Sequence, residues 1–247
     1  MYRDARAECD ELKGPDPFID LQWPASQRKK PEAFTSSERD RIIQHFIEND
    51  FFYFPWVFTL FHTGMRPSEA SALRWQDVNL ETMRISISKS RYMGTDSAPK
   101  TSQSARTIKI TGAVADVLKL LPSRELGIKH VFVNKLGDPM NPKKWAEHNW
   151  AEPLQKLGIN HRKFYCTRHS FITEMIERRE NPMAVAQYCG TSVQMIQEDY
   201  CGPLELGNRD NPGYRDQREQ HSGNRPFDRC STELRKTVAR YGCGAGI

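Results

Sequence analysis

The chain has 247 residues, and its 36 lysines and arginines exceed its 31 aspartates and glutamates, which gives a net charge of +5. Hydrophobic residues make up 38% of the sequence and aromatic residues 10%, so most of the chain is expected to be globular. No apolar run is long enough for a membrane-spanning helix, no secretion signal opens the chain, and the six cysteines form no CxxC pair. A membrane protein, a secreted mini-protein and a zinc ribbon are therefore excluded, while the small basic excess permits nucleic acid as a partner.

Composition divides the chain into three parts. Residues 1–31 are polar, hold four prolines and end in a basic run, which indicates a linker or the remnant of something upstream. Residues 32–202 carry regular apolar patterns and are expected to form the folded body. Residues 203–247 are rich in Gly, Asn, Asp and Arg with little apolar periodicity, which is typical of a mobile tail.

The first elements of the body are helical, and a small sheet follows them. Thr35 and Glu38 form a capping box, Gly64 suits a helix end, and Pro67 suits a first helical turn. Farther on, apolar residues alternate with polar ones, as strands require. The expected elements are helices opening at 35, over 52–63 and from 67 to about 75, then strands at 83–87 and 107–110 flanking a loop over 91–105.

Helical periodicity dominates the rest of the body. The expected elements are a helix over 113–121, a strand over 130–134, and helices over 142–157, 166–179, 182–189 and 192–200. The predicted fold class is therefore α+β, mainly helical, with a small antiparallel sheet.

Two arginines stand among apolar helix positions. Arg66 shares a helix face with Ala70 and Leu73, and Arg168 precedes the apolar face of a later helix. A buried guanidinium is costly without an anion, so each needs an internal carboxylate or an external anionic ligand. Both lie at helix starts, where backbone N–H groups also favour an anion. Together they indicate a clamp on one tetrahedral anion, because guanidinium groups pair with phosphate oxygens in a bidentate manner.

Four segments, in order along about 32–202, resemble the motifs of the tyrosine recombinases, the phage-integrase family. Residues 62–75 (HTGMRPSEASALRW) resemble the first arginine box of the family, and residues 165–171 (YCTRHSF) resemble the second. The hairpin that carries a catalytic lysine is similar to PKTS at 99–102, which leads to SARTI at 104–108. The segment ending in a nucleophilic tyrosine resembles CGTS at 189–192 with YCG at 200–202.

The resemblance implies a role for each matching residue. Arg66 and Arg168 would clamp the scissile phosphate. Glu69 would orient the site or exchange a proton, and Lys100 would protonate the leaving 5′ oxygen. Tyr200 would be the nucleophile, which requires cationic neighbours and a proton acceptor because a phenol is a poor nucleophile at neutral pH. From the residues alone, Lys100 also reads as a solvated hairpin lysine and Tyr200 as a core tyrosine.

The sequence departs from the family pattern at two positions that concern protons. Tyr165 stands where the second box usually begins with histidine, and Thr191 stands where the family usually has histidine or tryptophan. Tyr165 can donate a hydrogen bond to a phosphate oxygen but is a weak base, and Thr191 can only hydrogen-bond. His169 lies about 100° around the helix from Arg168, which favours a structural role. The identity of the general base is therefore left open.

The resemblance implies a site-specific DNA recombinase, an integrase from a phage or mobile element, that works through a 3′-phosphotyrosyl intermediate. No nucleotide cofactor or metal is expected, since the bond energy stays in the covalent intermediate. Expected partners are double-stranded DNA and further copies in a homo-tetramer on synapsed sites, in the cytoplasm of a bacterium. Residues 1–31 would be the remnant of an upstream core-binding domain, and the tail 203–247 would be mobile or exchanged between protomers. Two alternatives are a nicking-closing topoisomerase of the type IB class and a non-catalytic DNA-binding regulator derived from the same fold.

Overall fold

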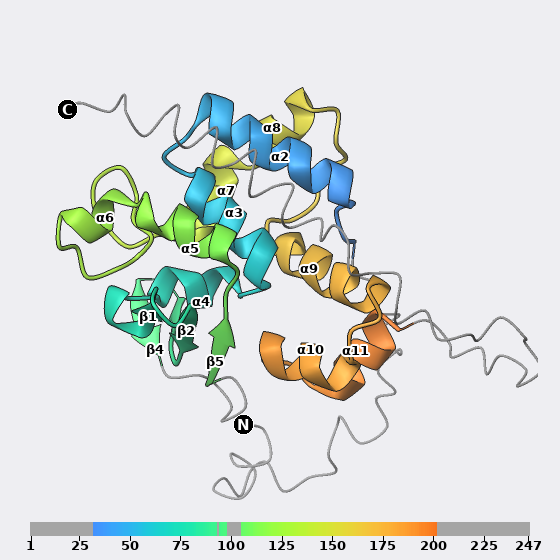
Figure 1. Cartoon of the computed structure of the whole chain (residues 1–247). Coiled ribbons are helices and arrows are strands. Elements are labelled where there is room, and N and C mark those ends of the chain that lie inside the picture. Colours follow the sequence, from blue (N-terminus) through green and yellow to red (C-terminus); the bar gives the residue numbers. More distant parts are fainter. Residues whose placement is uncertain (1–31, 93, 98–104, 202–247) are drawn as a thin grey trace, which may run out of the picture. The chain divides into compact units, whose positions relative to one another are not determined.

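The computed structural model describes residues 32–92, 94–97 and 105–201, and Figure 1 shows how their helices and strands are arranged. The predicted linker 1–31, the tail 203–247 and Lys100 lie outside these described residues. The described part is mainly helical with two small antiparallel sheets, which confirms the predicted fold class. Its helices are α2 (Ser36–Asn49), α3 (Phe54–Thr63), α4 (Pro67–Ala72), the 3₁₀ helix η2 (Trp75–Asp77), α5 (Gly112–Lys119), α6 (Pro122–Glu125), α7 (Pro142–Asn149), α8 (Ala151–Lys156), α9 (Cys166–Glu177), α10 (Pro182–Cys189) and α11 (Val193–Asp199). Its strands are β1 (Val78–Asn79), β2 (Arg84–Ile87), β3 (Ser90–Tyr92), β4 (Thr95–Ser97) and β5 (Arg106–Lys109).

Helix α2 begins with the capping box that the sequence predicts. The Thr35 hydroxyl accepts from the Glu38 backbone N–H at 3.2 Å, and the Glu38 carboxylate accepts from the Thr35 N–H at 2.8 Å. Two orphan donors at the helix start are thus satisfied within the chain.

The main sheet joins three strands in the order β1-β2-β5, and all its pairings are antiparallel. Ile85 pairs with Ile108, and both side chains are buried on the face that packs into the core. Polar residues alternate with them and face outward, as a sheet covered on one face requires.

A hairpin interrupts the segment that was expected to be a loop over 91–105. Strands β3 and β4 pair there, and the Arg91 guanidinium donates to the Asp96 carboxylate at 2.6 Å across the two strands. Arg74 donates to the same carboxylate at 2.7 Å. Ion pairs between charged side chains stabilise this hairpin, and it therefore does not require the alternating apolar residues that mark the other strands.

Two predictions were wrong in the region where residues 73–75 pair with residues 129–131: the end of the third helix and the strand over 130–134. The third helix ends at Ala72 rather than near Trp75, since Leu73 accepts from the Val131 N–H at 3.0 Å and the Trp75 N–H donates to Lys129 at 3.1 Å. The predicted strand 130–134 is likewise no strand. It consists of isolated bridges, one from His130 to Arg74 and one between Val133 and Pro139.

The predicted helix over 142–157 is two helices, α7 and α8, that meet at Trp150. Pro153 lies in the first turn of α8, where its missing N–H cannot continue the hydrogen-bond ladder of α7. Trp150 itself is buried, and its indole N–H donates to the Arg162 carbonyl at 2.8 Å.

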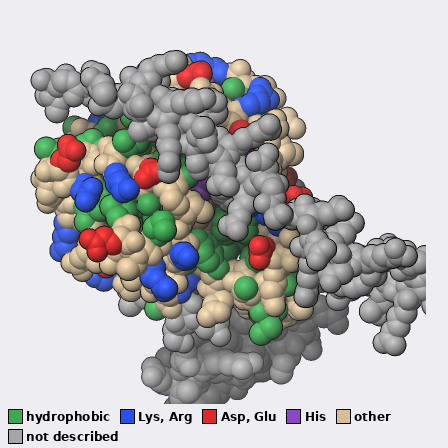
Figure 2. All heavy atoms as spheres, viewed as in Figure 1, with side chains coloured by type: hydrophobic (Ala, Val, Ile, Leu, Met, Phe, Trp, Pro, Cys, Tyr) green, Lys and Arg blue, Asp and Glu red, His purple; other side chains and the backbone are tan. Residues whose placement is uncertain are grey.

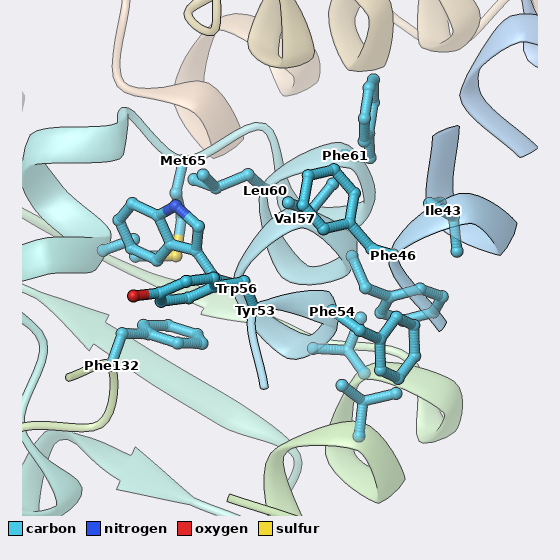
Figure 3. Packing of buried hydrophobic residues seen from close by; sticks show 14 of the residues in the cluster. Ile43, Phe46, Tyr53, Phe54, Trp56, Val57, Leu60, Phe61, Met65 and Phe132 are labelled. Atoms are coloured by element: carbon cyan, nitrogen blue, oxygen red, sulfur yellow. The ribbon is translucent and has the colours of Figure 1, made fainter. Parts of the chain in front are cut away.

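The core consists of two clusters of buried apolar side chains. The larger one surrounds α3, whose residues are all buried, and aromatic rings dominate it (Figure 3). The smaller one lies among α9, α10 and α11 (Figure 1) and comprises Phe171, Ile172, Val185, Ala186, Cys189 and Ile196. Helix α9 packs on both α3 and α10, so it joins the two clusters.

Acidic and basic side chains are interspersed on the visible face of the described residues in Figure 2, with apolar side chains between them. In the part of the chain that the structure describes, no helix combines the length and apolar character needed to cross a membrane.

Candidate active site

The turn between α3 and α4 places Arg66. Gly64 ends α3 in the left-handed conformation (φ +59°), and Arg66 is the N-cap residue of α4. Its side chain is 30% exposed, and it donates to the Glu69 carboxylate at 2.8 Å and to the Gly190 carbonyl at 2.8 Å. Arg66 therefore has the internal carboxylate partner that the sequence left open, and it also links α4 to the end of α10.

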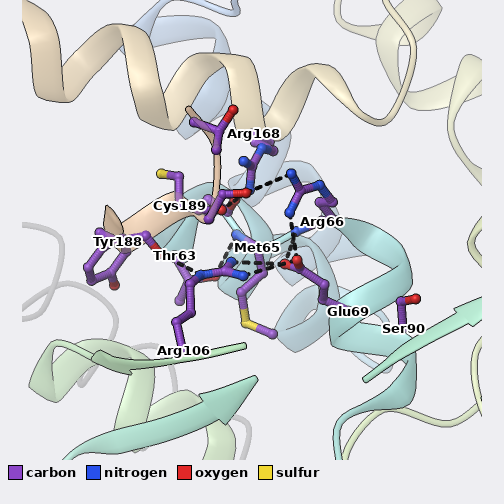
Figure 4. A network of polar contacts seen from close by, with 12 residues as sticks. Thr63, Met65, Arg66, Glu69, Ser90, Arg106, Arg168, Tyr188 and Cys189 are labelled. Carbon is purple, nitrogen blue, oxygen red and sulfur yellow. Dashed lines mark hydrogen bonds and ion pairs between the residues drawn. The ribbon is translucent and has the colours of Figure 1, made fainter. Parts of the chain in front are cut away.

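Glu69 is the centre of a buried ionic network (Figure 4). Its carboxylate is 5% exposed and accepts from Arg66 and from both terminal nitrogens of Arg106, at 3.0 and 2.9 Å. It also accepts from the Arg66 backbone N–H at 2.9 Å. Burial alone would raise the pKa of Glu69, but Arg106 and Arg66 outweigh burial and lower the pKa below its ordinary value. Glu69 is therefore ionised at neutral pH, which favours an orienting role over proton exchange.

Arg106 is a site residue that our sequence analysis missed. It is 6% exposed, and besides Glu69 it bonds the Tyr188 carbonyl at 2.7 Å, so it ties β5 to α10. The available signal was its position: Arg106 and Ile108 are two residues apart on a strand and thus share the inward face. An arginine on the apolar face of a strand predicts a buried anionic partner.

Arg168 lies in the first turn of α9 and is 2% exposed. One of its terminal nitrogens donates to the Gly64 carbonyl at 2.8 Å and to the Cys189 carbonyl at 2.7 Å. Among the described residues, no carboxylate forms an ion pair with it. Burial lowers the pKa of Arg168 below its ordinary value, although that value is so high that the guanidinium stays charged.

Tyr165 and Thr191 lie beside the two arginines. Tyr165 immediately precedes α9 and is 40% exposed. Burial alone would lower the pKa of Arg66, but Glu69 and then Tyr165 outweigh burial and raise the pKa above its ordinary value. Thr191 follows Gly190, whose carbonyl binds Arg66, and its hydroxyl contacts the Met195 sulfur at 3.2 Å. The Tyr165 side chain thus borders Arg66, whereas the Thr191 hydroxyl contacts Met195 and only the neighbouring Gly190 carbonyl binds Arg66.

Tyr200 ends α11 and packs partly buried against the smaller apolar cluster. Its hydroxyl contacts Nδ1 of His169. We expected a structural role for His169, because it lies about 100° around its helix from Arg168. Burial raises the pKa of Tyr200 above its ordinary value, while the nearby Arg168 acts in the opposite direction. The phenol is therefore protonated at rest, next to a histidine and a buried arginine.

The structure thus brings together most of the site residues that the sequence predicts. These are Arg66, Glu69, Tyr165, Arg168, Thr191 and Tyr200, contributed by α4, α9 and the segment from α10 to the end of α11. Two fixed positive charges beside a phenol suit the binding of an anion that the phenol can attack.

Comparison with known proteins gives the same indication. The model of the phage integrase family matches residues 33–202. Prophage integrase IntR of Escherichia coli (strain K12) is 23% identical over 210 residues, which are 74% of this chain and 50% of that protein. A XerC-like tyrosine recombinase of Caldanaerobacter subterraneus subsp. tengcongensis is 24% identical over 159 residues, which are 53% of this chain and 40% of that protein. The chain therefore spans about half the length of these relatives.

Solved structures share the fold. The integrase of transposon Tn1549, in complex with a circular intermediate DNA, superposes with a TM-score of 0.64 at 19% identity, over 81% of this chain and 71% of that one. The match to the family model covers more than half of the chain and includes both arginines, Glu69 and Tyr200. The chain therefore belongs to the phage integrase family, the tyrosine recombinases.

Proposed function

We propose that this chain is the catalytic part of a site-specific DNA recombinase of the integrase type. Tyr200 attacks a DNA phosphodiester, which forms a 3′-phosphotyrosyl link and releases a 5′-hydroxyl. The 5′-hydroxyl of a second strand then attacks that link, which forms a new DNA joint and frees Tyr200. One observation carries the proposal: Arg168 is a buried guanidinium that forms no ion pair with a carboxylate of the described residues, and it lies next to Arg66 and to the phenol of Tyr200.

The charge of Arg168 is what a phosphate would satisfy. The hydrogen-bond partners of Arg168 among the described residues are two carbonyls, and burying a guanidinium against them costs stability because neither carbonyl carries a full negative charge. A phosphate between Arg168 and Arg66 would offset that charge, and both groups would stabilise the negative charge that develops on the phosphate oxygens during attack. The free protein thus bears the cost of burying Arg168, and in return the guanidinium is already in place for the transition state.

The remaining residues have distinct roles in this proposal. Lys100 protonates the leaving 5′ oxygen. Tyr165 and Thr191 donate hydrogen bonds to the phosphate oxygens, and Glu69 fixes the orientation of Arg66. Each of these groups supplies charge or a proton from the chain itself, and the reaction keeps the bond energy in the phosphotyrosyl link, so the proposal includes no metal or nucleotide cofactor.

The proposed partner is double-stranded DNA, bound by four copies of the protein on two synapsed sites in the cytoplasm. The fold shared with a transposon integrase that was solved on DNA supports the DNA partner. The net charge of +5 agrees with a polyanionic ligand.

A Tyr200→Phe variant of the full chain tests the proposal. The DNA would be a nicked duplex whose site is recovered by selecting random duplexes for binding, with the nick placed so that the cleaved fragment diffuses away. Wild type should accumulate a covalent protein–DNA adduct in EDTA, and Tyr200→Phe should form none while binding DNA as tightly and with the same salt dependence. An adduct from Tyr200→Phe at the wild-type rate would refute the role of Tyr200.

Two further outcomes separate the alternatives. Relaxation of supercoiled plasmid that lacks the selected site would favour the nicking-closing topoisomerase. Tight binding without any adduct from wild type on the selected site would favour the non-catalytic regulator. Arg168→Ala serves as the second control, because it should lose the adduct while Tyr200 keeps its hydroxyl.

A further inference from the structure

His169 lies between the two tyrosines of the site. Its ring centroid is 5.2 Å from that of Tyr165 and 5.9 Å from that of Tyr200. Its Nδ1 contacts the Tyr200 hydroxyl, the atom that would attack phosphorus. The contact joins the start of α9 to the end of α11.

The protonation states of His169 and Tyr200 allow the tyrosine hydroxyl to donate a hydrogen bond to Nδ1. Burial, and then the charge of Arg168, lower the pKa of His169 below its ordinary value, against the opposing effect of Asp199. Burial raises the pKa of Tyr200. At neutral pH the imidazole is therefore neutral and the phenol is protonated, and in the tautomer with its proton on Nε2 the hydroxyl donates and Nδ1 accepts. Within the described part of the chain, the charged groups that act on the pKa of His169 are Arg168 on its own helix and Asp199 on α11.

The two positions at which this chain departs from the family pattern do not supply a histidine that could take the proton of Tyr200. Tyr165 stands where the family usually has histidine, and Thr191 stands where it usually has histidine or tryptophan, so neither position supplies an imidazole. Glu69 is engaged by two arginines, and His62 is fully buried against Phe58, with its Nδ1 on the Phe58 carbonyl at 2.9 Å. Among the described residues, His169 is the imidazole in contact with the attacking oxygen.

We propose that His169 accepts the proton of Tyr200 as that tyrosine attacks the scissile phosphate. This role rests on the proposed function. The Oη–H bond of Tyr200 breaks and an N–H bond forms at Nδ1 of His169, while Oη forms its bond to phosphorus. The bond from phosphorus to the 5′ oxygen breaks, and that oxygen leaves with the electron pair and takes a proton from Lys100. In the rejoining step the imidazolium returns its proton to Oη of Tyr200, while the attacking 5′-hydroxyl gives its proton back to Lys100.

A measurement without DNA tests the hydrogen bond by itself. In the full chain, labelled with ¹⁵N-histidine, the signals of His169 are assigned by their loss in His169→Asn. We expect the neutral tautomer with its proton on Nε2 at neutral pH, and a changed Nδ1 signal in Tyr200→Phe. A proton on Nδ1, or signals unaffected by Tyr200→Phe, would overturn the proposal.

Two variants separate a proton acceptor from a positioning residue. His169→Asn can still accept a hydrogen bond from Tyr200 but cannot take its proton, whereas His169→Phe can do neither. On the nicked duplex we expect both to form the adduct about 10²–10⁴-fold more slowly than wild type. The wild-type rate should rise through the lowered pKa of His169 and then level off, while the rate of His169→Asn should keep rising at higher pH. A wild-type rate and pH profile in His169→Asn would refute the role.

A sulfur in place of the bridging 5′ oxygen shows on which side of the reaction His169 acts. A thiolate leaves without being protonated, so this substrate should restore the rate of Lys100→Ala, the matched control, but not that of His169→Asn. Restoration of His169→Asn by sulfur would mean that His169 acts on the leaving group, which overturns the assignment. If wild type forms no adduct on either substrate, the proposed function itself fails.

Discussion

Arg106 and Arg168 are both buried arginines, but their partners differ. Arg106 is paired with the Glu69 carboxylate, whereas the partners of Arg168 within the described part of the chain are the carbonyls of Gly64 and Cys189. Removing Arg106 would break a buried ion pair and leave Glu69 with Arg66 as its remaining cationic partner; breaking a buried pair costs about 3–5 kcal/mol. Removing a charge that has no counter-charge avoids that penalty, although it leaves two carbonyls without their donor.

The two arginines should therefore respond differently to methionine. We expect Arg106→Met to lower the free energy of unfolding by about 3–5 kcal/mol and Arg168→Met to lower it by less. Of the two variants, Arg168→Met is the one that leaves the ion pairs of Glu69 in place. Urea denaturation of both variants measures the difference. Equal losses would show that the charge of Arg168 is compensated in the free protein after all.

His62 couples stability to pH. Burial, and then the charge of Arg39, lower its pKa from 6.5 to about 3. In the unfolded state His62 takes up a proton below about pH 6.5, whereas in the folded state it does so only near pH 3. The folded state therefore loses stability as the pH falls between these values, by about 1.4 kcal/mol per unit.

We expect wild type to lose about 2 kcal/mol more than His62→Asn when the pH falls from 6.5 to 5.0. Asparagine retains a donor for the Phe58 carbonyl but does not titrate. Denaturant titrations of both proteins at the two pH values give the difference, in which the other histidines cancel. Parallel losses would place the acid sensitivity elsewhere.

At the scale of elements, the contact between α3 and α9 depends on Gly64. A Cβ atom there would lie 2.4 Å from a ring carbon of Phe171 on α9, and the backbone is left-handed. The Gly64 carbonyl also binds Arg168. The end of one helix thus sets both the spacing of α9 and the orientation of an arginine of the site.

Gly64→Ala should lower the free energy of unfolding by about 2–5 kcal/mol, from the left-handed backbone and from the contact with Phe171. Gly127→Ala is the matched control, because Gly127 has a similar φ of +65° but nothing within 4 Å of its Cβ position. We expect only about 1–2 kcal/mol there. Thermal or urea unfolding compares them, and a Gly64→Ala protein as stable as the control would mean that Phe171 moves aside freely.

The elements differ in how far the sequence could predict them. Helix α2 was predictable because its capping box and apolar stripe are local. The β3–β4 hairpin was not, since the Arg91–Asp96 pair that supports it leaves no apolar alternation. The early end of α4 also escaped prediction, because it depends on pairing with residues about 55 positions away.

The candidate site divides in the same way. Arg168 could be predicted because a charged residue on an apolar helix face is visible in the sequence. Arg66 could be predicted from its position at a helix start, although it is the N-cap residue of α4 and does not share a helix face with Leu73 as expected. The contact of His169 with Tyr200 depends on how α9 packs against α11, and periodicity along one helix does not contain that information. Arg106 lies between these cases, since its strand position was visible but its partner was not.

At the scale of the whole described part, the two apolar clusters differ in size. The cluster around α3 draws on most of the chain, whereas six buried residues form the one that supports α10 and α11. A region with fewer buried apolar contacts opens at lower free energy than the core. The segment of α10 and α11, which leads to Tyr200, is thus the part of the described residues that is expected to open first.

Native-state hydrogen exchange measures this difference. Amides of α10 and α11 should exchange at a lower free energy than those of α3, and Ile196→Ala should lower the former by about 2–5 kcal/mol with little effect on the latter. A uniform response of all three helices would show that the described residues unfold as one unit.

One carboxylate, Glu69, serves two arginines that come from different elements, and this constrains how the sequence can evolve. A change of Glu69 removes the carboxylate that both arginines share, and the loss of Arg106 leaves the buried carboxylate with Arg66 as its remaining cationic partner. Drift at any of the three positions is therefore tolerated only alongside a compensating change at another. Among relatives aligned to this chain, we expect the identities at positions 66, 69 and 106 to be inherited as a set, while the exposed residues between them vary independently.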